Sequence, residues 1–449
     1  MNDQWNGIRK VVVSGILLAG GLAAAGSALA QAGEQFIGLP SYRVGAYASG
    51  GSGIYGGWID YMAMINERDG GINGVKLTWE ECETEYNNAR GVECYERLKK
   101  KGTTGNTVFQ PLSTGITYSV IDRATADKIP VISMGYGRTD ASDGRVFPYV
   151  FPLVTNYWSQ NTAKIKFIGQ KEGGMDKLKG KKIGVGYHDS AFGKELLPIL
   201  QERAAQYGFT LLLLPIAAPG VEQKATWLQV RQQQPDYVIL QTWGVMTAAA
   251  VKEAQAVGYP REKMFGTWWS GAEPDLKDVG QGAKGYSAVM MQHGAELQSD
   301  VVKEILEKVH AKGQGTGPKD EVGQVLYMRG VIGAVLAVEG VRTAQDRFGK
   351  GKVMTGEQAR WGYENLNLTQ AKLDALGFKG VMRPVSTNCV DHMGSAWTRV
   401  HTWDGSKFVW SSDWLQADEQ VIRPLVKSSA EKYAAEKKLT RRTPADCQS

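Results

Sequence analysis

Residues 107–119 read Thr-Val-Phe-Gln-Pro-Leu-Ser-Thr-Gly-Ile-Thr-Tyr-Ser and predict a strand that passes directly into a helix. The apolar run ends at Pro111, because proline interrupts the hydrogen bonding of a strand. Ser113 and Thr114 then stand where a helix begins, since small hydroxyl side chains accept hydrogen bonds from the first free helical N–H groups. The remaining free N–H groups lie at the positive end of the helix dipole, which binds carboxylates and phosphates well.

A second apolar run, residues 129–133, follows this predicted helix and ends in the glycine-rich turn of residues 134–137. Where two parallel strands end beside a helix N-terminus, the sheet leaves a crevice at its carboxyl edge. We therefore predict a binding site for a small anion at this place. The simpler alternative is that Ser113 and Thr114 are ordinary helix caps.

The first 30 residues have the pattern of a secretory signal peptide. Arg9 and Lys10 form a basic start, residues 11–26 are apolar and rich in small side chains, and Ala28-Leu-Ala30 matches a cleavage site. The basic pair is not Arg-Arg, which favours a Sec-type route over twin-arginine export. We expect cleavage near Ala30 and an exported mature chain that starts near Gln31.

The mature chain is long enough for two domains of ordinary size, and its charge is only mildly basic. Its 52 basic and 46 acidic residues give a formal net charge of +6, without a dense basic block of the kind that binds nucleic acid. The longest later apolar stretch, residues 331–338, is bounded by Arg329 and Glu339, so no second membrane helix is expected.

Four cysteines in an oxidising compartment predict disulfides, and four cysteines allow three pairings. We favour Cys82–Cys94 with Cys389–Cys447, because the first pair would join the end of a strand to the next helix. The cysteine spacing fits no zinc pattern, and the five histidines stand apart from the cysteines. No metal site and no cofactor are expected.

Strand-like and helix-like runs alternate through most of the chain. In the first unit we expect strands at residues 42–47, 75–81, 107–111 and 129–133, a glycine-rich turn at 49–57, and helices after that turn and at 89–101. In the second unit we expect strands at 181–187, 209–214, 236–241, 264–267 and 285–291, with helices at 158–170, 193–207, 224–233 and 246–257. This alternation predicts an α/β fold with mainly parallel sheets that helices cover on both faces.

The last third of the chain departs from this alternation. Helices are expected at residues 301–312 and 322–348 with no strand between them. Strands at 397–402 and 407–410 flank Asp404-Gly405, which is typical of a β-hairpin turn. A charged helix at 428–438 follows the hairpin.

Gly51-x-Gly53-x-x-Gly56 matches the dinucleotide-binding pattern, and the next predicted strand ends in Glu80 and Glu81, as a ribose-binding acid would. An exported chain, however, meets no maintained NAD pool, and no His or Lys stands near a hydride-transfer site. The sequence around Ser190 also lacks the first glycine of a hydrolase nucleophile elbow. We predict no catalytic residues, and an exported dinucleotide-dependent or hydrolytic enzyme is the alternative.

Aromatic residues cluster after the predicted strands of the second unit. Tyr187 and His188 follow one strand, Trp243 follows another, and Trp268 and Trp269 follow a third. In an α/β sheet these carboxyl ends border the crevice where ligands bind, so the rings could form a ligand wall. The alternative is that they pack in the core or between two domains.

Taken together, the chain resembles the leucine/isoleucine/valine-binding family of periplasmic solute-binding proteins, the receptors of branched-chain amino-acid ABC transporters. The resemblance covers nearly all of the mature chain. It is carried by the order and spacing of residues 42–50, 65–74, 112–114, 129–133, 187–190, 254–259 and 265–266. It implies a type I periplasmic binding protein, with two lobes that are each a mainly parallel sheet flanked by helices.

The family fold also implies three crossovers between the lobes. We expect them near residues 152–157, 289–292 and 381–386. The N-terminal lobe then comprises residues 41–154 plus 291–383. The C-terminal lobe and tail comprise residues 155–290 plus 384–449.

The resemblance also implies roles for residues at the site. Thr114, with Ser113 beside it, corresponds to the residue that meets the ligand carboxylate, and Trp243 to an aromatic residue that closes over the ligand. Trp268 occupies the place where the family has an acid that pairs with the ligand ammonium. The full set of expected ligand contacts is Tyr47, Ser49, Ser113, Thr114, Tyr136, Gly137, Tyr187, Trp243 and Trp268.

The resemblance implies a receptor and not an enzyme. It would be a periplasmic monomer that captures a small organic solute and delivers it to an inner-membrane permease with its own ATPase. Because Trp268 cannot replace a carboxylate, the ligand could be an aromatic or aliphatic acid, or an amide, as well as an amino acid. A sensory receptor with the same fold is a further alternative.

Overall fold

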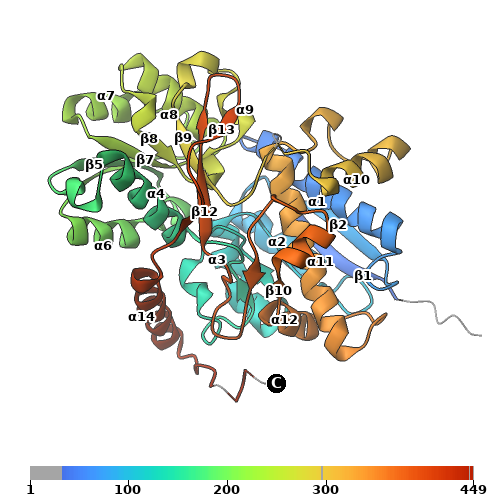
Figure 1. Cartoon of the computed structure of the whole chain (residues 1–449). Coiled ribbons are helices and arrows are strands. Elements are labelled where there is room, and N and C mark those ends of the chain that lie inside the picture. Colours follow the sequence, from blue (N-terminus) through green and yellow to red (C-terminus); the bar gives the residue numbers. More distant parts are fainter. Residues whose placement is uncertain (1–32, 295–296, 444, 448–449) are drawn as a thin grey trace, which may run out of the picture. The chain divides into compact units, whose positions relative to one another are not determined.

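Two β-sheets form the frame of the protein in a computed structural model that describes residues 33–447 except 295, 296 and 444 (Figure 1). Residues 32–449 form one compact unit. The predicted signal peptide, residues 1–30, lies outside the described residues. We call each sheet, together with the helices packed on it, a lobe. The predicted lobe boundaries at residues 154, 290 and 383 stay predictions.

The first sheet is parallel and has the order β2-β1-β3-β4, with Phe109 bridged between β1 and β3. Its strands are β1 (Gln35–Ser41), β2 (Leu77–Glu83), β3 (Val131–Ile132) and β4 (Val150–Phe151). The strand predicted at 107–111 is reduced to the single bridged residue Phe109, which exchanges backbone hydrogen bonds with the chain around β3.

The prediction of a first strand at residues 42–47 is wrong. The strand is β1, which ends at Ser41, and all seven of its residues are buried. A strand buried on both faces shows no alternation of polar and apolar residues, and the Gly and Pro in β1 further hide it. Residues 42–47 form the connection to helix α1 (Ala48–Asp69).

The predicted glycine-rich turn at residues 49–57 is also wrong, because these residues form the first turns of α1. Their glycines allow α1 to pack closely on α11 (Val325–Phe348). A Cβ atom on Gly57 would lie 2.1 Å from the carbonyl oxygen of Tyr327, and one on Gly330 would lie 1.8 Å from that of Ile54. The dinucleotide-like pattern thus lies inside a packed helix and not in a phosphate-binding loop.

Helices cover both faces of the first sheet (Figure 1). They are α1, α2 (Asn88–Leu98), α3 (Thr114–Ala126), α10 (Asp300–Lys308), α11, α12 (Gly356–Glu364) and α13 (Gln370–Ala375). Helices α12 and α13 were not predicted, nor was the small antiparallel pair β10 (Asn367–Leu368) and β11 (Val385–Ser386).

The second sheet is mainly parallel and has the order β13-β12-β9-β8-β7-β5-β6, with β14 paired to β12. Its parallel strands are β5 (Lys182–His188), β6 (Thr210–Ile216), β7 (Tyr237–Gln241), β8 (Met264–Gly266) and β9 (Ser287–Met290). The antiparallel strands are β12 (Trp397–Trp403), β13 (Phe408–Trp410) and β14 (Leu415–Gln416). This confirms the predicted strands and the hairpin around Asp404-Gly405.

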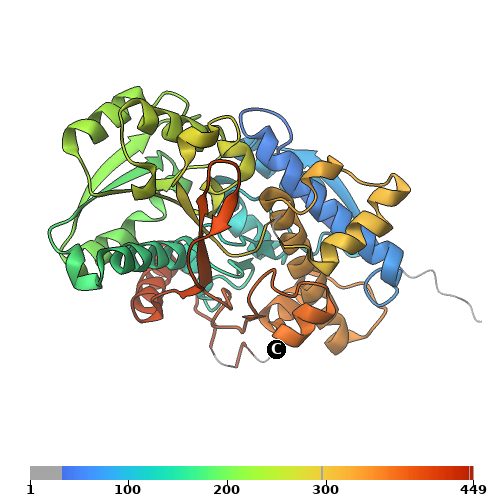
Figure 2. The same cartoon turned by 45° about the horizontal axis from the view of Figure 1, so that its top comes forward.

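Helices α4 (Tyr157–Glu172), α5 (Ala191–Lys194), α6 (Leu197–Tyr207), α7 (Lys224–Gln233), α8 (Val245–Ala256) and α9 (Glu273–Leu276) pack around this sheet. The chain passes between the lobes after β4, after β9 and after β11. The last helix, α14 (Glu419–Lys437), lies beside α4, as its dark red ribbon shows in Figures 1 and 2.

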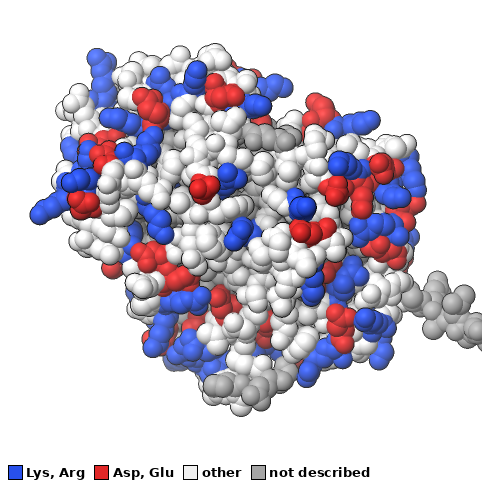
Figure 3. Space-filling model, in the orientation of Figure 1, with Lys and Arg blue, Asp and Glu red and all other residues white. Residues whose placement is uncertain are grey.

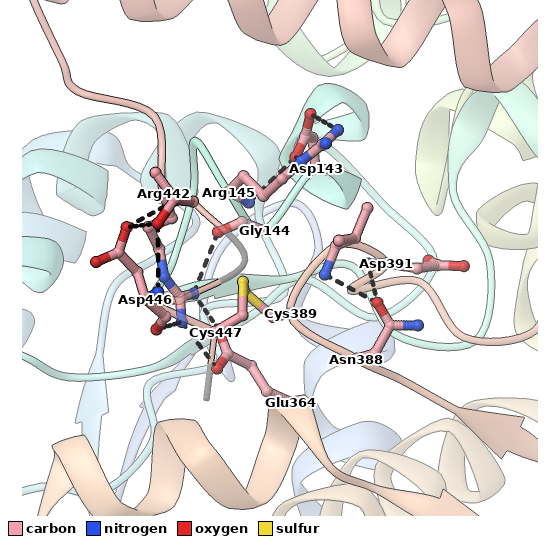
Figure 4. The surroundings of a disulfide bond; sticks show 12 residues. Asp143, Gly144, Arg145, Glu364, Asn388, Cys389, Asp391, Arg442, Asp446 and Cys447 are labelled. Carbon is pink, nitrogen blue, oxygen red and sulfur yellow. Dashed lines mark hydrogen bonds and ion pairs between the residues drawn. A yellow bond between two sulfur atoms is a disulfide. The ribbon is translucent and has the colours of Figure 1, made fainter. Parts of the chain in front are cut away.

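Both predicted disulfides are present. Cys82 at the end of β2 pairs with Cys94 in α2, and Cys389 pairs with Cys447 near the end of the chain. Around the second bond, the carboxylate of Glu364 accepts hydrogen bonds from Arg442 (Figure 4). The C-terminal residues are thereby fastened to α12 as well as to the loop after β11.

Charged side chains of both signs are interspersed over the face shown in Figure 3. None of the helices formed by the described residues is long and apolar enough to cross a membrane.

Candidate functional site

Helix α3 begins at Thr114, as predicted, and Ser113 is its N-cap. The Ser113 hydroxyl accepts a hydrogen bond from the backbone N–H of Ile116 at 3.3 Å. Leu112, directly before the cap, has φ +49, a conformation that costs a non-glycine residue about 1–3 kcal/mol. Ser113 and Thr114 are both almost completely buried. The helix end therefore points its free N–H groups into the interior of the protein and not into solvent.

Tyrosine hydroxyls surround this helix end. Burial raises the pKa of Tyr157, while the nearby side chains of Thr114 and Trp269 lower it. The Tyr157 hydroxyl is fully buried and makes no well-formed hydrogen bond, although Thr114 and Trp269 lie near it. Burial also raises the pKa of Tyr86, and Ser113 lowers it. The α3 N-terminus is thus lined by neutral hydroxyls that can donate to an anion.

Tyr136 has a more structural position beside the same helix. Its hydroxyl accepts a hydrogen bond from the Leu112 N–H and donates to the Ile132 carbonyl, each at 3.0 Å. These bonds hold the strained residue before the α3 cap. Gly137 lies close by, since a Cβ atom there would stand 2.8 Å from Cγ2 of Thr114. Any side chain at Gly137 would therefore crowd the helix end.

Trp243, which follows β7 in the second lobe, is inserted among tyrosines of the first lobe. It stacks on Tyr47 with ring centroids 4.3 Å apart and planes at 13°. Tyr42 and Tyr86 approach the same indole, at 5.5 and 4.9 Å. We call these four rings the aromatic junction. A Cβ atom on Gly50 would lie 2.9 Å from the indole, so glycine is needed for this approach.

Trp268 and Trp269 continue the aromatic surface on the second-lobe side. Their ring centroids lie 4.2 Å apart, and Trp269 lies 5.7 Å from Trp243. Trp268 is fully buried, and its indole N–H has no hydrogen-bond partner. It also lies against the predicted contact turn, because a Cβ atom on Gly135 would stand 3.0 Å from the indole. The two lobes therefore meet through rings on both sides of α3.

Glu195 is an acidic group of the second lobe that contacts the first lobe near α3. Its carboxylate accepts hydrogen bonds from the Thr139 hydroxyl at 2.7 Å and from the Thr139 N–H at 3.2 Å, and also from Tyr118. Burial raises the pKa of Glu195 to about 8, although the hydrogen bond from Thr139 lowers it. The carboxyl group therefore takes up a proton more readily in this arrangement than in water.

A cavity of about 430 Å³ opens beside these groups. Its walls come from both lobes and include Tyr47, Tyr86, Ser113 and Gly115 from the first and His188 and Phe192 from the second. A volume of this size is ordinary for a small-molecule site. Among the described residues, no three His, Cys, Asp or Glu side chains are grouped as a metal site requires.

The structure brings most of the predicted contacts together. Those gathered around the α3 N-terminus and the aromatic junction are Tyr47, Ser113, Thr114, Tyr136, Gly137, Trp243 and Trp268. Two lie apart from them. Tyr187 packs in the core under the second sheet, and Ser49 is exposed in the first turn of α1.

Several residues at the site were not predicted. Tyr86 lies outside the predicted elements, Tyr157 falls only within the crossover expected at residues 152–157, and Arg329 appears only as the boundary of the apolar stretch 331–338. Glu195 follows a short helix and has no motif around it. Only Trp269 had a signal in the sequence, as a second aromatic residue after a strand.

Comparison with known proteins agrees with this arrangement. The sequence model described as "Periplasmic binding protein" matches residues 34–407. The chain belongs to the periplasmic binding protein family. This confirms the predicted type I, two-lobed α/β fold. A search of curated protein sequences gives no match.

Solved structures show the same fold. This chain is similar to a crystal structure from the Pseudomonas fluorescens group that is described as an ABC transporter permease. The two share 43% identity and a TM-score of 0.85, over 92% of this chain and 99% of that one. A branched-chain amino acid ABC transporter protein from Thermus thermophilus with bound valine has 20% identity and a TM-score of 0.71, over 88% of this chain and 99% of that one. An R. palustris solute-binding protein in complex with 4-hydroxybenzoate has 16% identity and a TM-score of 0.66, over 88% of this chain and 100% of that one.

Proposed function

We propose that this protein is the extracytoplasmic solute receptor of an ABC importer and that its ligand is a small organic carboxylate held between the lobes. The ligand carboxylate would lie at the N-terminus of α3 and accept hydrogen bonds from the free backbone N–H groups and from Ser113 and Thr114. Trp243 would close over the ligand from the second lobe.

The observation that carries this proposal is the buried polar surface at α3. A helix N-terminus alone is common, but here it faces the Tyr157 hydroxyl, which is buried without a hydrogen-bond partner. Leaving such a group unpaired costs about 1–3 kcal/mol. A bound acceptor group would recover that free energy, because it can take hydrogen bonds from Tyr157 and from the helix end together.

The solved relatives support the same ligand chemistry. One holds valine and another 4-hydroxybenzoate, and both of these molecules carry a carboxylate. The rest of the two molecules differs, which fits a site that recognises the acid group with polar atoms and the remainder with aromatic walls. Both an amino acid and an organic acid therefore belong in any test of binding.

Transport requires the two lobes to close around the solute and the closed form to dock on a permease driven by its ATPase. We propose that the exported protein does this in the periplasm as a monomer, after removal of residues 1–30. The family membership supports this proposal. Deletion of the gene should abolish uptake of the solute that the purified protein binds.

The direct test is isothermal titration of the mature protein with amino acids and with aromatic and aliphatic acids. At least one carboxylate should bind, and Thr114→Ala should weaken its binding by about 1–3 kcal/mol, because a buried hydrogen-bond partner is lost. Ser119→Ala is the matched control, since Ser119 is an exposed hydroxyl residue on the same helix. Absence of binding by any carboxylate would reject the proposal.

A further inference from the structure

Arg329 is a buried cation at the contact between the lobes. It belongs to α11 of the first lobe and is fully buried. Its guanidinium reaches the second lobe, where Nη2 donates to the Trp268 carbonyl and, at 3.4 Å, to that of Gly271. The guanidinium also lies over both indoles, 4.7 Å from the centroid of Trp268 and 5.4 Å from that of Trp269.

The remaining donors of Arg329 are unused. Nε and Nη1 are buried and have no hydrogen-bond partner, and none of the ion pairs among the described residues includes this guanidinium. Burial lowers the pKa of Arg329 to about 10, so the group still carries its charge at neutral pH. Asp275 and Glu273 act on this charge through space, but its buried donors without hydrogen-bond partners are still costly.

Other unpaired donors lie beside the same rings. The indole N–H of Trp268 and the hydroxyls of Tyr42 and Tyr157 are also buried without partners. An indole N–H and a guanidinium can only donate hydrogen bonds, and a tyrosine hydroxyl can donate one. The complementary ligand group is therefore an acceptor. An ammonium offers three donors and no acceptor, so it cannot satisfy this set.

The Arg329 end is continuous with the α3 end of the site. Trp269 lies under the guanidinium and also faces Tyr157, which in turn faces Thr114. Trp269 is therefore a neighbour that the Arg329 end and the α3 end share.

We propose that Arg329 is a second anion contact of the proposed solute site and that it selects organic acids that lack an ammonium group. This inference rests on the proposed function. The same guanidinium attracts a carboxylate and repels the ammonium of an amino acid, so Arg329 would determine which acids bind.

Glu195, the acid beside α3, is hydrogen-bonded to Thr139, and two other acids lie near Arg329. Asp275 and Glu273 are the acids that act on Arg329 through space. Burial raises the pKa of Asp275 well above its usual range, and Glu273 accepts a hydrogen bond from the Val325 N–H at 3.2 Å, at the start of α11.

A purely structural role explains only part of this arrangement. Through Nη2, Arg329 ties the turn at Trp268 to α11, and a structural arginine would do the same. Such a role leaves Nε and Nη1 unpaired, whereas a ligand acceptor would use them. The two interpretations differ in what they predict for ligand selectivity.

The test compares acids that differ only in the ammonium group. Valine is titrated against 3-methylbutanoate, and phenylalanine against 3-phenylpropanoate. We expect the acid without the ammonium to bind about 10- to 100-fold more tightly in at least one pair, as for hydrogen bonds to a charged partner. Equal or tighter binding of the amino acids would overturn the inference while leaving the proposed receptor function intact.

Variants then assign this preference to Arg329. Arg329→Lys should keep most of the selectivity because it keeps the charge, and Arg329→Met should reduce the ratio within each pair toward one. Arg347→Met is the matched control, since Arg347 is exposed near the other end of α11. Unchanged selectivity in a folded Arg329→Met protein would overturn the assignment. If that variant does not fold, the wild-type ratios and the Lys variant decide.

If neither member of any pair binds, and the wider panel also fails, the proposed function itself fails. That result differs from a reversed preference, so the two failures are distinguishable.

Discussion

The aromatic junction and the C-terminal segment, residues 418–443 and 445–447, both join the two lobes, but they do so with different interactions. At the junction, Trp243 touches Tyr42, Tyr47 and Tyr86 only through ring contacts. The C-terminal segment uses hydrogen bonds, ion pairs and a disulfide. Ring contacts are weakly directional and can part and re-form, whereas a covalent bond cannot.

The C-terminal segment contacts elements of both lobes. Tyr433 in α14 stacks on Phe147, with centroids 4.6 Å apart, and its hydroxyl donates to Asp122 of α3 at 2.9 Å. At the start of α14, Asp418 pairs with Arg203 of α6 at 2.5 Å. The segment lies outside residues 34–407, the part of the chain that matches the family model.

The two contacts between the lobes differ in whether they can open. If the proposed solute enters between the lobes, the ring contacts of the aromatic junction have to part, whereas the disulfide of the C-terminal segment stays closed. The C-terminal segment is attached to both lobes. It would then keep its contacts while the lobes turn about it. The predictions below test this difference.

The largest effect is expected for removal of the Cys389–Cys447 disulfide. The bond closes a loop with a sequence separation of 58 residues, and a loop of that size contributes about 4 kcal/mol to the free energy of unfolding. The double variant Cys389→Ser/Cys447→Ser should lose stability of this order, measured by denaturant unfolding under non-reducing conditions.

The first disulfide provides the matched control. Cys82–Cys94 has a sequence separation of 12 residues and lies within the first lobe, so its removal should cost about 3 kcal/mol. It should leave ligand affinity unchanged, whereas loss of the C-terminal bond should alter it. Equal effects of the two double variants on stability and affinity would show that the C-terminal bond does not fasten the lobes.

The next largest effect is expected on ligand affinity when Trp243 is replaced. Trp243→Ala removes the central ring of the junction and one wall of the proposed site. Ligand binding should weaken by about 1–3 kcal/mol, since an aromatic contact is lost. The unfolding midpoint should change less than in the disulfide variant, because the junction has to part whenever a solute enters. Calorimetric titration and thermal unfolding measure the two effects.

Trp227 is a suitable control for this variant. It is equally buried but lies in the core of the second lobe, away from the first. Trp227→Phe should lower stability and leave affinity unchanged. If Trp243→Ala behaves in the same way, the ring belongs to the core and the junction does not bind the solute.

The α3 site was the most predictable part of the molecule because its signals are local. A proline, two hydroxyl residues and a following apolar run specify a strand end and a helix cap within a few residues, and Ser113 is that cap. The alternation of strands and helices was equally local, so most elements of the second lobe were confirmed. Both disulfides were also predicted correctly.

The errors arose where distant segments determine the local structure. The glycines of 49–57 suggested a turn, but their role depends on α11, which lies some 270 residues later and packs against them. Strand β1 is buried on both faces and therefore lacks the alternation that identifies a strand. Arg329 could not be recognised as a site residue, because its importance comes from the indoles that surround it and from the absence of a hydrogen-bond partner for two of its donors.

The smallest effect on ligand affinity is expected at Glu195, a polar residue that joins the two lobes beside α3. Burial raises its pKa from 4.5 to about 8 in the closed arrangement, and opening would return the carboxyl to water. The closed form then binds a proton that the open form releases between pH 4.5 and 8. Closure should therefore weaken as pH rises through this window, and ligand affinity should fall with it by about 1 kcal/mol, since the group is only half-buried.

The variant Glu195→Gln isolates the contribution of Glu195 to the pH dependence of ligand affinity, because glutamine has nearly the same shape as glutamate but does not titrate. Affinity of the variant, measured by titration from pH 5 to 8, should be nearly independent of pH. His188 is the other titratable group near the cavity, and burial lowers its pKa below the usual 6.5, so any effect of it lies at the acidic end. A wild-type affinity that rises with pH would contradict the prediction. It would mean that Glu195 stays ionised when the lobes close, and that the contact with Thr139 is an ordinary charged hydrogen bond, closer in kind to those of the C-terminal segment than to the aromatic junction.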